Sequence, residues 1–343
     1  MKKFILLLGA ALCMMTACNK EENNNVPDSH DTTPTEIPVT EGTFNPEMKL
    51  SEVYSEISSD ETGEWVSEGR FKIEEYHWNG NLLSSVTYYQ YGEMLATETF
   101  NYDDRNRISG STISYSDMPE GAYSEYSYVG EMLSSISVHE NNQLVESYTF
   151  THTDGNITKL DIKLYEIDYA FAKLRGHLNP LRGILPRQMS DAINNAINMN
   201  ARNAKSAPYM EYTVNFIWDG NNITNMNLNI EEDAVSINYT YDNMQNPYYG
   251  FFGGLNMALS LEMGFNMLAQ NNPTIMNSTT TVEGVSFQST ATFSYLYNGK
   301  WPTKSTREAP ITIYEFDYNT GEIVPSEDSY NERMVTEYIY CGQ

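Results

Sequence analysis

A short motif that returns along the chain limits the possible folds more than any other feature. It consists of an aromatic residue, any residue, a second aromatic residue or histidine, a turn with Gly, Asn or Asp, and an aliphatic residue that opens an alternating stretch. The first four copies begin 24, 26 and 24 residues apart. The copies begin at Tyr76, Phe100, Tyr126, Phe150, Phe216, Tyr239, Tyr295 and, truncated, Tyr338. Apolar and polar residues that alternate around Asn-Gly or Asp-Gly predict β-hairpins with one buried face.

These hairpins predict an antiparallel meander, because tight turns cannot connect parallel strands. The best internal match places two alternating stretches 66 residues apart, Ile157 to Leu164 and Ile223 to Ile230. About sixteen strands are too many for a flat sheet. The sequence therefore predicts a mainly β fold, a strongly curved open sheet or half-barrel.

Two segments break the alternation and predict helical insertions. In residues 168–207, Met189, Ile193, Ala196 and Ile197 fall on one face of a helix that Ser190 can cap. Residues 255–270 are rich in Met and apolar nearly all round, which predicts a helix buried against the concave face of the sheet.

The amino terminus has the pattern of a secretory signal. Met1 to Lys3 is basic, Phe4 to Leu12 is an apolar run, and Met15 to Cys18 ends in small residues and a cysteine. Such a stretch is too short for a membrane span. Its end resembles the lipobox of bacterial lipoproteins, in which the cysteine, here Cys18, becomes the lipidated first residue. The alternative is a secreted protein with an incidental cysteine.

The residues after Cys18 predict where the protein is located. Asn19 to Glu22 resembles the export signal of surface lipoproteins in Gram-negative gut anaerobes. We therefore expect a lipid anchor in the outer membrane and a chain that faces the extracellular side, with the periplasmic side as the alternative. Lipid on Cys18 is then the expected membrane contact.

Three parts of the chain are expected. Residues 1–17 are the predicted signal peptide, residues 18–48 a lipidated disordered tether, and residues 49–343 a single repetitive β domain with the helical insertions. The tether is polar and contains four prolines, so it cannot bury enough apolar surface to become ordered. A flexible chain of this length spans on the order of 30 Å.

Charge and cysteine usage exclude several classes of function. The formal net charge is −26, and it becomes −28 when Lys2 and Lys3 leave with the signal. Such an acidic chain repels phosphate backbones, so no nucleic acid is expected as a partner. With Cys13 in the signal and Cys18 lipidated, only Cys341 is left, so neither a disulfide nor a cysteine-ligated zinc site is predicted.

Some copies of the motif resemble known repeats. Phe100 to Ile108 is similar to the tyrosine-aspartate repeats of Rhs-type shell proteins, with Asn106 where those repeats usually have glycine. Tyr239 to Tyr248 and Tyr297 to Pro302 resemble more closely an uncharacterised repeat-domain family in lipoproteins of Gram-negative gut anaerobes. The resemblance covers about residues 70 to 342. It implies an extracytoplasmic β-rich fold and no established activity. Because the predicted helical segments interrupt the repeats, we expect a half-barrel similar to outer-membrane lipoprotein carriers rather than a closed shell.

The sequence predicts no catalytic residues, no metal site and no cofactor. No two of the five histidines are four residues apart with a glutamate between them, so a helical zinc protease site is not expected. Acidic pairs such as Glu74 and Glu75 are expected on solvated faces of such an acidic chain. No glycine-rich phosphate loop follows a predicted strand. We therefore predict that the protein is not an enzyme.

Aromatic residues are the remaining candidates for ligand binding. Trp78, Tyr102, Tyr128, Trp218 and Tyr241 recur with the motif, which predicts cross-strand packing. A less regular group lies near turn glycines and is the candidate for a patch that stacks on sugars or binds a partner, with core packing as the alternative. This group consists of Tyr248, Tyr249, Phe251, Phe252 and Trp301.

Three functions follow in order of preference. The first is a non-enzymatic surface module for binding or adhesion, with a glycan or protein ligand. The second is a carrier or sensor of an apolar small molecule held between the curved sheet and the Met-rich helix, because Met-lined surfaces adapt to varied apolar partners. The third is a hydrolase, which needs two carboxylates, or a His and a Ser, that converge in a cleft.

Overall fold

The strands of this chain form one barrel. The computed structural model describes residues 49–60, 64–116, 121–165, 209–230, 233–249, 268–282, 285–312, 314–317, 322–325 and 329–342. In the first half of the chain the strands are β1 (Leu50–Ser59), β2 (Val66–Asn79), β3 (Leu82–Gln90), β4 (Glu93–Tyr102), β5 (Ile108–Tyr115), β6 (Ala122–Val129), β7 (Met132–Glu140), β8 (Gln143–Thr153) and β9 (Asn156–Tyr165). In the second half they are β10 (Tyr209–Asp219), β11 (Asn222–Ile230), β12 (Asp233–Gln245), β13 (Asn271–Val282), β14 (Val285–Asn298), β15 (Trp301–Ile311), β16 (Tyr314–Asp317), β17 (Glu322–Pro325) and β18 (Tyr330–Tyr340).

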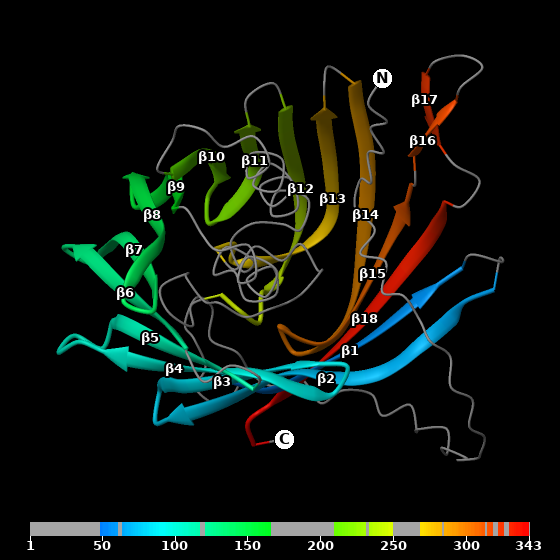
Figure 1. Ribbon diagram of the computed structural model, residues 1–343. Coiled ribbons are helices and arrows are strands. Elements are labelled where there is room, and N and C mark those ends of the chain that lie inside the picture. The colour runs from blue at the N-terminus through cyan, green and yellow to red at the C-terminus, as the bar shows by residue number, and fades with distance from the viewer. Residues whose placement is uncertain are drawn as a thin grey trace.

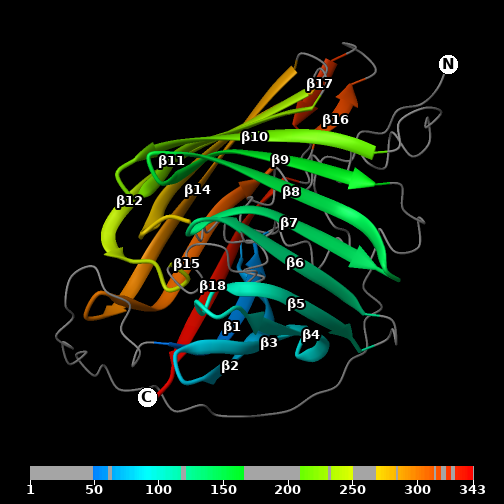
Figure 2. The same cartoon turned by 90° about the vertical axis from the view of Figure 1, so that its left-hand side faces the viewer.

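Sixteen of these strands close into an antiparallel barrel (Figure 1). From β1 to β15 each strand pairs with the next, and Figure 2 shows β5 to β11 side by side along one wall. β18 then pairs with both β15 and β1. β16 and β17 form a separate two-stranded sheet inserted between β15 and β18. The predicted meander of hairpins is therefore confirmed.

The prediction of an open sheet or half-barrel is wrong. β1 and β18 pair in antiparallel register from Leu50↔Tyr340 to Ser59↔Glu332, which closes the ring. Closure satisfies the backbone N–H and C=O groups that an open sheet leaves unpaired at its edges. Alternation and turn residues specify local hairpins, and they carry no information about pairing between strands almost 300 residues apart.

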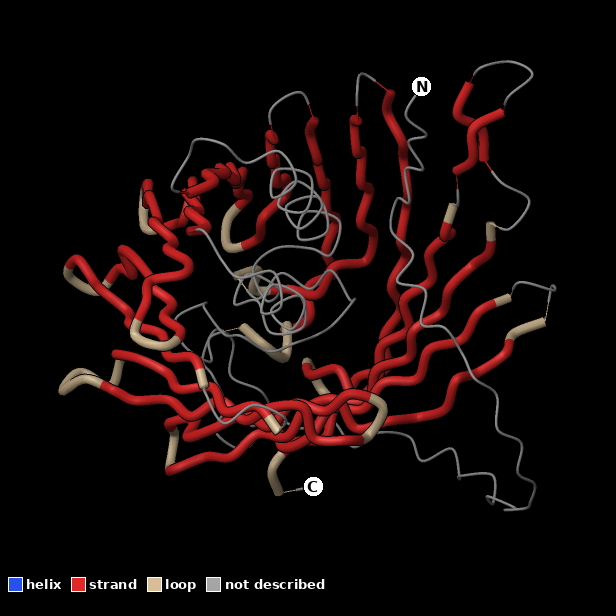
Figure 3. The backbone as a smooth tube through the Cα atoms, viewed as in Figure 1, coloured by secondary structure: helices blue, strands red, loops and turns tan. Residues whose placement is uncertain are grey.

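The helical insertions are not part of the described structure. Figure 3 shows strands and turns in the described residues and no helix. Residues 168–207 lie outside the described residues, as do residues 255–267 of the second predicted insertion. Leu268, Ala269 and Gln270, which that prediction included, are not helical and lead directly into β13.

Alternating side chains divide the barrel into an inner and an outer wall. On β9, Leu160, Ile162 and Leu164 are 0 to 4% exposed, whereas the residues between them face outwards. The turns provide the required backbone conformation: Gly80 has a φ of 58°, and Asn141 and Asn142 have φ of 50° and 60°. Positive φ matches the twist of a two-residue hairpin, and Gly and Asn adopt it at the lowest steric cost.

One rim of the barrel carries a ring of hydrogen bonds that the motif builds. In most copies the second aromatic residue, or the histidine in its place, donates from its ring N–H or hydroxyl to a backbone carbonyl near the start of the neighbouring strand. In the copy that begins at Tyr295, the first aromatic residue is the donor. The donor and acceptor pairs are Trp78 with Leu50, Tyr102 with Leu83, Tyr128 with Ile108, His152 with Leu133, Trp218 with Ile157, Tyr241 with Ile223, Tyr295 with Pro273 and Tyr340 with Pro302, at 2.6 to 3.0 Å. These eight bonds join alternate strand pairs round the rim: β1 with β2, β3 with β4, and so on to β15 with β18. The aromatic residues thus stabilise the rim by packing and by satisfying carbonyls that lie beside the turns.

Candidate binding surface

The inner wall of the barrel is mainly apolar and the outer wall is mainly polar. Buried residues such as Val214, Leu228 and Ile237 are fully covered on the inner side. The outward positions of the barrel strands hold mainly Asn, Ser, Thr, Lys and Glu. Large apolar side chains on the outside are scattered, as with Ile217 and Leu296, 55% and 62% exposed. Membrane-spanning barrels have the opposite arrangement, with an apolar band facing lipid, so this outer wall suits water and polar partners.

Two glutamates lie on the inner wall of β2 and β4. The Glu74 side chain is 0% exposed, and its Oε2 accepts a hydrogen bond of 2.7 Å from the Tyr76 hydroxyl. Glu98 is 1% exposed and accepts one of 3.0 Å from Tyr88. Burial raises the pKa of both carboxyl groups to about 7, although the tyrosine hydroxyls oppose the shift. Both groups are too deeply buried to contact a ligand on the outer wall.

A network of ion pairs crosses the outer wall where the first and last strands meet. We call this region the charged seam; it comprises β15, β18, β1 and β2. Arg70 on β2 lies 2.6 Å from Glu337 on β18, and Lys304 on β15 lies 3.8 Å from the same carboxylate. The Arg70 guanidinium also stacks over the Tyr54 ring, 3.7 Å from its centre. These contacts link the four strands that complete the ring.

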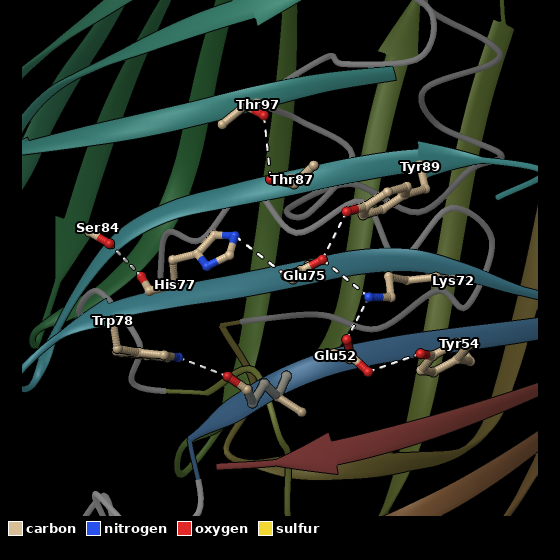
Figure 4. A network of polar contacts seen from close by, with 11 residues as sticks. Glu52, Tyr54, Lys72, Glu75, His77, Trp78, Ser84, Thr87, Tyr89 and Thr97 are labelled. Carbon is tan, nitrogen blue, oxygen red and sulfur yellow. Dashed lines mark hydrogen bonds and ion pairs between the residues drawn. The ribbon is translucent and has the colours of Figure 1, made fainter. Parts of the chain in front are cut away.

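Lys72 is the centre of this network (Figure 4). Its ammonium group lies 2.5 Å from Glu52 and 3.1 Å from Glu75, and Tyr89 donates a further hydrogen bond of 2.8 Å to Glu75. Partial burial disfavours the charged form of Lys72, but the hydrogen bonds to both carboxylates outweigh this and raise its pKa. The bond from Lys72 lowers the pKa of Glu52. The positive charge of Lys72 is therefore already neutralised by Glu52 and Glu75, so it is not available to a ligand.

The adjacent wall has no such network. β11, β12, β13 and β14 together hold two acidic residues, Asp233 and Asp242, and no Lys or Arg. Asp242 accepts hydrogen bonds from the Tyr297 hydroxyl and the Asn272 backbone N–H on the two strands that follow, so its carboxylate is already engaged within the wall. The outward positions of these strands are mainly Asn, Gln, Ser and Thr, with the apolar Ile275 and Leu296 among them, and most are exposed. We call the outer wall of β10 to β14 the neutral face.

Two of the five aromatic residues predicted to bind a ligand, Tyr248 and Trp301, lie in the core. Tyr248 is 1% exposed and packs edge to face against Tyr338, with ring centres 6.1 Å apart. Trp301 is also 1% exposed and packs against Tyr340. Tyr249 is half-buried. Phe251 and Phe252 lie outside the described residues, as does Cys18, so ligand binding by this group and lipidation of Cys18 stay predictions.

Sequence reasoning missed the features that distinguish the outer wall. The charged seam joins residues 267 positions apart, such as Arg70 and Glu337, and no local pattern reveals such pairs. The neutral face did leave a signal, because a chain with 46 acidic and 20 basic residues has four strands almost without charge. The packing role predicted for Trp78, Tyr102, Tyr128, Trp218 and Tyr241 is confirmed, since all five pack against the core cluster.

Comparison with known proteins identifies no family for this chain. No family model matches the sequence, and no curated protein matches it. A porin-like protein from Bacteroides uniformis is 12% identical over 86% of this chain and 99% of its own, with a TM-score of 0.42. A porin-like protein from Bacteroides vulgatus is 10% identical over 86% and 100%, with a TM-score of 0.30. A TcdB2-TccC3-Cdc42 structure matches 71% of this chain and 15% of its own, at 13% identity and a TM-score of 0.18.

The described residues contain neither a metal-binding group nor a helix that could span a membrane. No three or more His, Cys, Asp or Glu side chains in these ranges are grouped so as to hold a metal ion. No helix in the same ranges is long and apolar enough to span a membrane.

Proposed function

We propose that this protein is a non-enzymatic binding module, anchored by lipid on Cys18 to the outer membrane and facing the cell exterior. Its ligand, a glycan or a protein, contacts the outer wall of the barrel. The polarity of the two walls is the observation that carries this proposal. Apolar side chains fill the inner positions, while the outer positions offer amides, hydroxyls and charged groups to the surroundings.

The anchor and the tether support the same function. A lipidated cysteine followed by about 30 polar residues holds a barrel away from the bilayer surface, at a distance on the order of 30 Å. A closed barrel exposes no strand edge to neighbouring proteins. Contacts with a partner must then be made by side chains of the outer wall or by the loops.

Binding of the mature protein to a glycan array and to immobilised host-matrix proteins tests this function. We expect saturable binding to at least one class of ligand. Absence of binding across both panels would contradict the proposal. The anchor is tested separately by incorporation of labelled fatty acid, which Cys18→Ala should abolish and the control Cys341→Ala should leave unchanged.

A carrier of an apolar small molecule is the second candidate. The inner wall is apolar and includes the buried methionines Met226, Met276 and Met334, which suit varied apolar ligands. Native mass spectrometry of the purified protein should then show a co-purifying small molecule. An empty protein that also fails to take up added fatty acids would exclude this function.

A further inference from the structure

The neutral face is arranged in regular rows across five strands. Because the strands pair in register, outward residues of β10 to β14 lie opposite one another. The first row contains Ile217, Asn225, Asn238, Asn277 and Thr290, and the second contains Asn215, Asn227, Ser236, Thr279 and Gln288. Neighbouring strands are about 4.8 Å apart, so each row presents polar groups at this interval over about 19 Å.

The two rows are uncharged although the chain as a whole is strongly acidic. Neither row contains a Lys, Arg, Asp or Glu. Charges return at the borders of the rows, with Glu211 near the start of β10, Lys159 and Asp161 on β9 and Glu308 on β15. Surface charges are inexpensive to keep in contact with water, whereas a bound partner would have to desolvate them. A wall without charges therefore suits a partner that brings no charge of its own.

Hydrogen bonds within the rows hold the amide groups in place. Asn225 donates from its side chain to Asn238 Oδ1 at 2.8 Å, and Asn227 donates to Asn225 Oδ1. On the next strands the Thr290 hydroxyl donates to Asn277 Oδ1 at 2.7 Å. Each side-chain amide has two donor hydrogens and an acceptor oxygen, so the rows keep further hydrogen-bonding capacity towards the outside. Amides that are already oriented lose less conformational entropy on binding.

We infer that the neutral face binds an uncharged, hydroxyl-rich polymer, a neutral polysaccharide, laid along the rows. Sugar hydroxyls both donate and accept, as do the amides and hydroxyls of the face. Ile217 and Ile275, 55% and 37% exposed, lie within and beside the first row and contact the apolar C–H faces of sugar rings. This inference names the ligand class for the proposed binding module and rests on that function.

Binding of the mature protein to soluble neutral polysaccharides tests the inference. Affinity electrophoresis in gels that contain starch, mannan or a β-glucan should show retardation by at least one polymer. Polygalacturonate and heparin, which are anionic, should cause none. The affinity should change less than twofold between about 0.05 and 0.5 M NaCl, because no ion pair forms on binding.

Single Asn→Asp substitutions locate the site. Asn238→Asp and Asn277→Asp place a charge in the first row without changing side-chain size, and each should weaken binding about tenfold, or about 1.4 kcal/mol. The matched control is Asn101→Asp on the exposed outer wall of β4, which should bind like the unmodified protein. Unchanged thermal unfolding of all three variants shows that the barrel is intact.

The outcomes separate this inference from the broader function. If Asn238→Asp and Asn277→Asp leave polysaccharide binding unchanged, the neutral face is not the binding site, although the protein is still a binding module. Binding only to anionic polymers or only to a protein would overturn the inference in the same way. If the protein forms a dimer and these substitutions disrupt it, the neutral face binds a second copy of this chain, which overturns the inference. Absence of any ligand in the wider panels would contradict the proposed function itself.

Discussion

The charged seam and the neutral face are adjacent parts of one barrel, and they use their outer walls differently. In the seam, Arg70, Glu337 and Lys304 link strands from the two ends of the chain. In the neutral face, Asn225, Asn238 and their neighbours carry no charge and make short hydrogen bonds among themselves. The difference continues through the wall, because buried Glu74, Glu332 and Arg307 lie behind the seam, whereas buried Met226, Leu228 and Ile237 lie behind the neutral face.

This contrast follows from how each part obtains its register. Most strands of the neutral face are joined by short turns, which set the pairing locally. The seam must select one pairing between β1 and β18 without a connecting turn, and ion pairs and buried polar groups favour a single register. The outer side chains of the neutral face are not needed to set the strand register, so they are available for a ligand.

The largest effect is expected from the buried ion pair of the seam. Arg307 Nη1 lies 2.7 Å from Glu332 Oε1, and the two side chains are 6% and 10% exposed. Arg307→Met leaves the Glu332 carboxylate buried without its partner, so the free energy of unfolding should fall by about 3 to 5 kcal/mol. Urea denaturation measures this loss.

The exposed pair Arg333 and Glu308 on the same strands provides the control. These side chains are 36% and 47% exposed, and their atoms also lie 2.7 Å apart. Arg333→Met should lower the free energy of unfolding by less than about 1 kcal/mol, because solvent screens the pair. Equal losses in the two variants would contradict the view that burial gives the seam its stabilising role.

Glu74 should make stability depend on pH. Its pKa rises from 4.5 in the unfolded chain to about 7 in the barrel, where burial disfavours the charge. Between these values the folded state holds a proton that the unfolded state has released, so stability decreases as pH rises and levels off above 7. A shift of this size corresponds to about 3 kcal/mol.

Glu74→Gln removes this contribution. Denaturation at intervals from pH 4.5 to 8 should show a shallower decrease than in the unmodified protein, and Glu74→Gln with Glu98→Gln a shallower one still. Tyr76, Tyr88, Tyr126 and Tyr248 face these carboxyls and stay neutral in this range, because burial raises the pKa of each well above 10. An unchanged pH profile would show that the carboxyls are not buried as described.

The rim ring is common to both regions and should contribute equally in each. The Tyr340 hydroxyl donates to Pro302 O at 2.7 Å in the seam, and the Tyr241 hydroxyl to Ile223 O at 2.6 Å in the neutral face. Tyr340→Phe and Tyr241→Phe should each lower the free energy of unfolding by about 1 kcal/mol, by loss of one hydrogen bond. Thermal denaturation compares the stability of the two variants. If only Tyr340→Phe lowers the stability, the rim hydrogen bonds stabilise the seam and not the neutral face.

The smallest effect on stability is expected in the neutral face. Asn238→Asp should change the free energy of unfolding by no more than about 0.5 kcal/mol, as is usual for exposed sites outside a stabilising network. A loss of several kcal/mol in urea denaturation would show that the rows stabilise the barrel. It would contradict the view that these side chains serve ligand binding rather than folding.

The sequence predicts the hairpins because their determinants are local. Gly80 and Gly220 have φ of 58° in the turns where Asn-Gly and Asp-Gly predict them, and Ile157 to Leu164 alternates as a half-buried strand must. Closure could not be predicted, because Leu50 and Tyr340 are neighbours only in three dimensions. The helices predicted from the pattern of Ile193 and Ile197 lie outside the described residues.

The sequence did not predict the neutral face as the candidate site. Tyr248 and Trp301 stood out in the sequence as irregular aromatic residues near glycines, and the barrel uses both in its core. No sequence pattern marks Asn225, Asn238 or Asn277. They form a surface only when three strands pair in register. A count of charges along the sequence would have found β11 to β14.

Disulfide formation across the seam tests the closed barrel most directly. The starting protein lacks Cys18 and Cys341. In one variant both Ser55 and Thr336 are changed to cysteine, and in a second variant both Glu56 and Val335, which are the next facing pair. One of these pairs has the closer spacing of a non-hydrogen-bonded position, which suits a disulfide. Thr87 and Thr97, which face each other on β3 and β4, provide the control pair. Peptide mass spectrometry after mild oxidation should find a disulfide in the control and in at least one seam pair; a disulfide in the control alone would contradict closure.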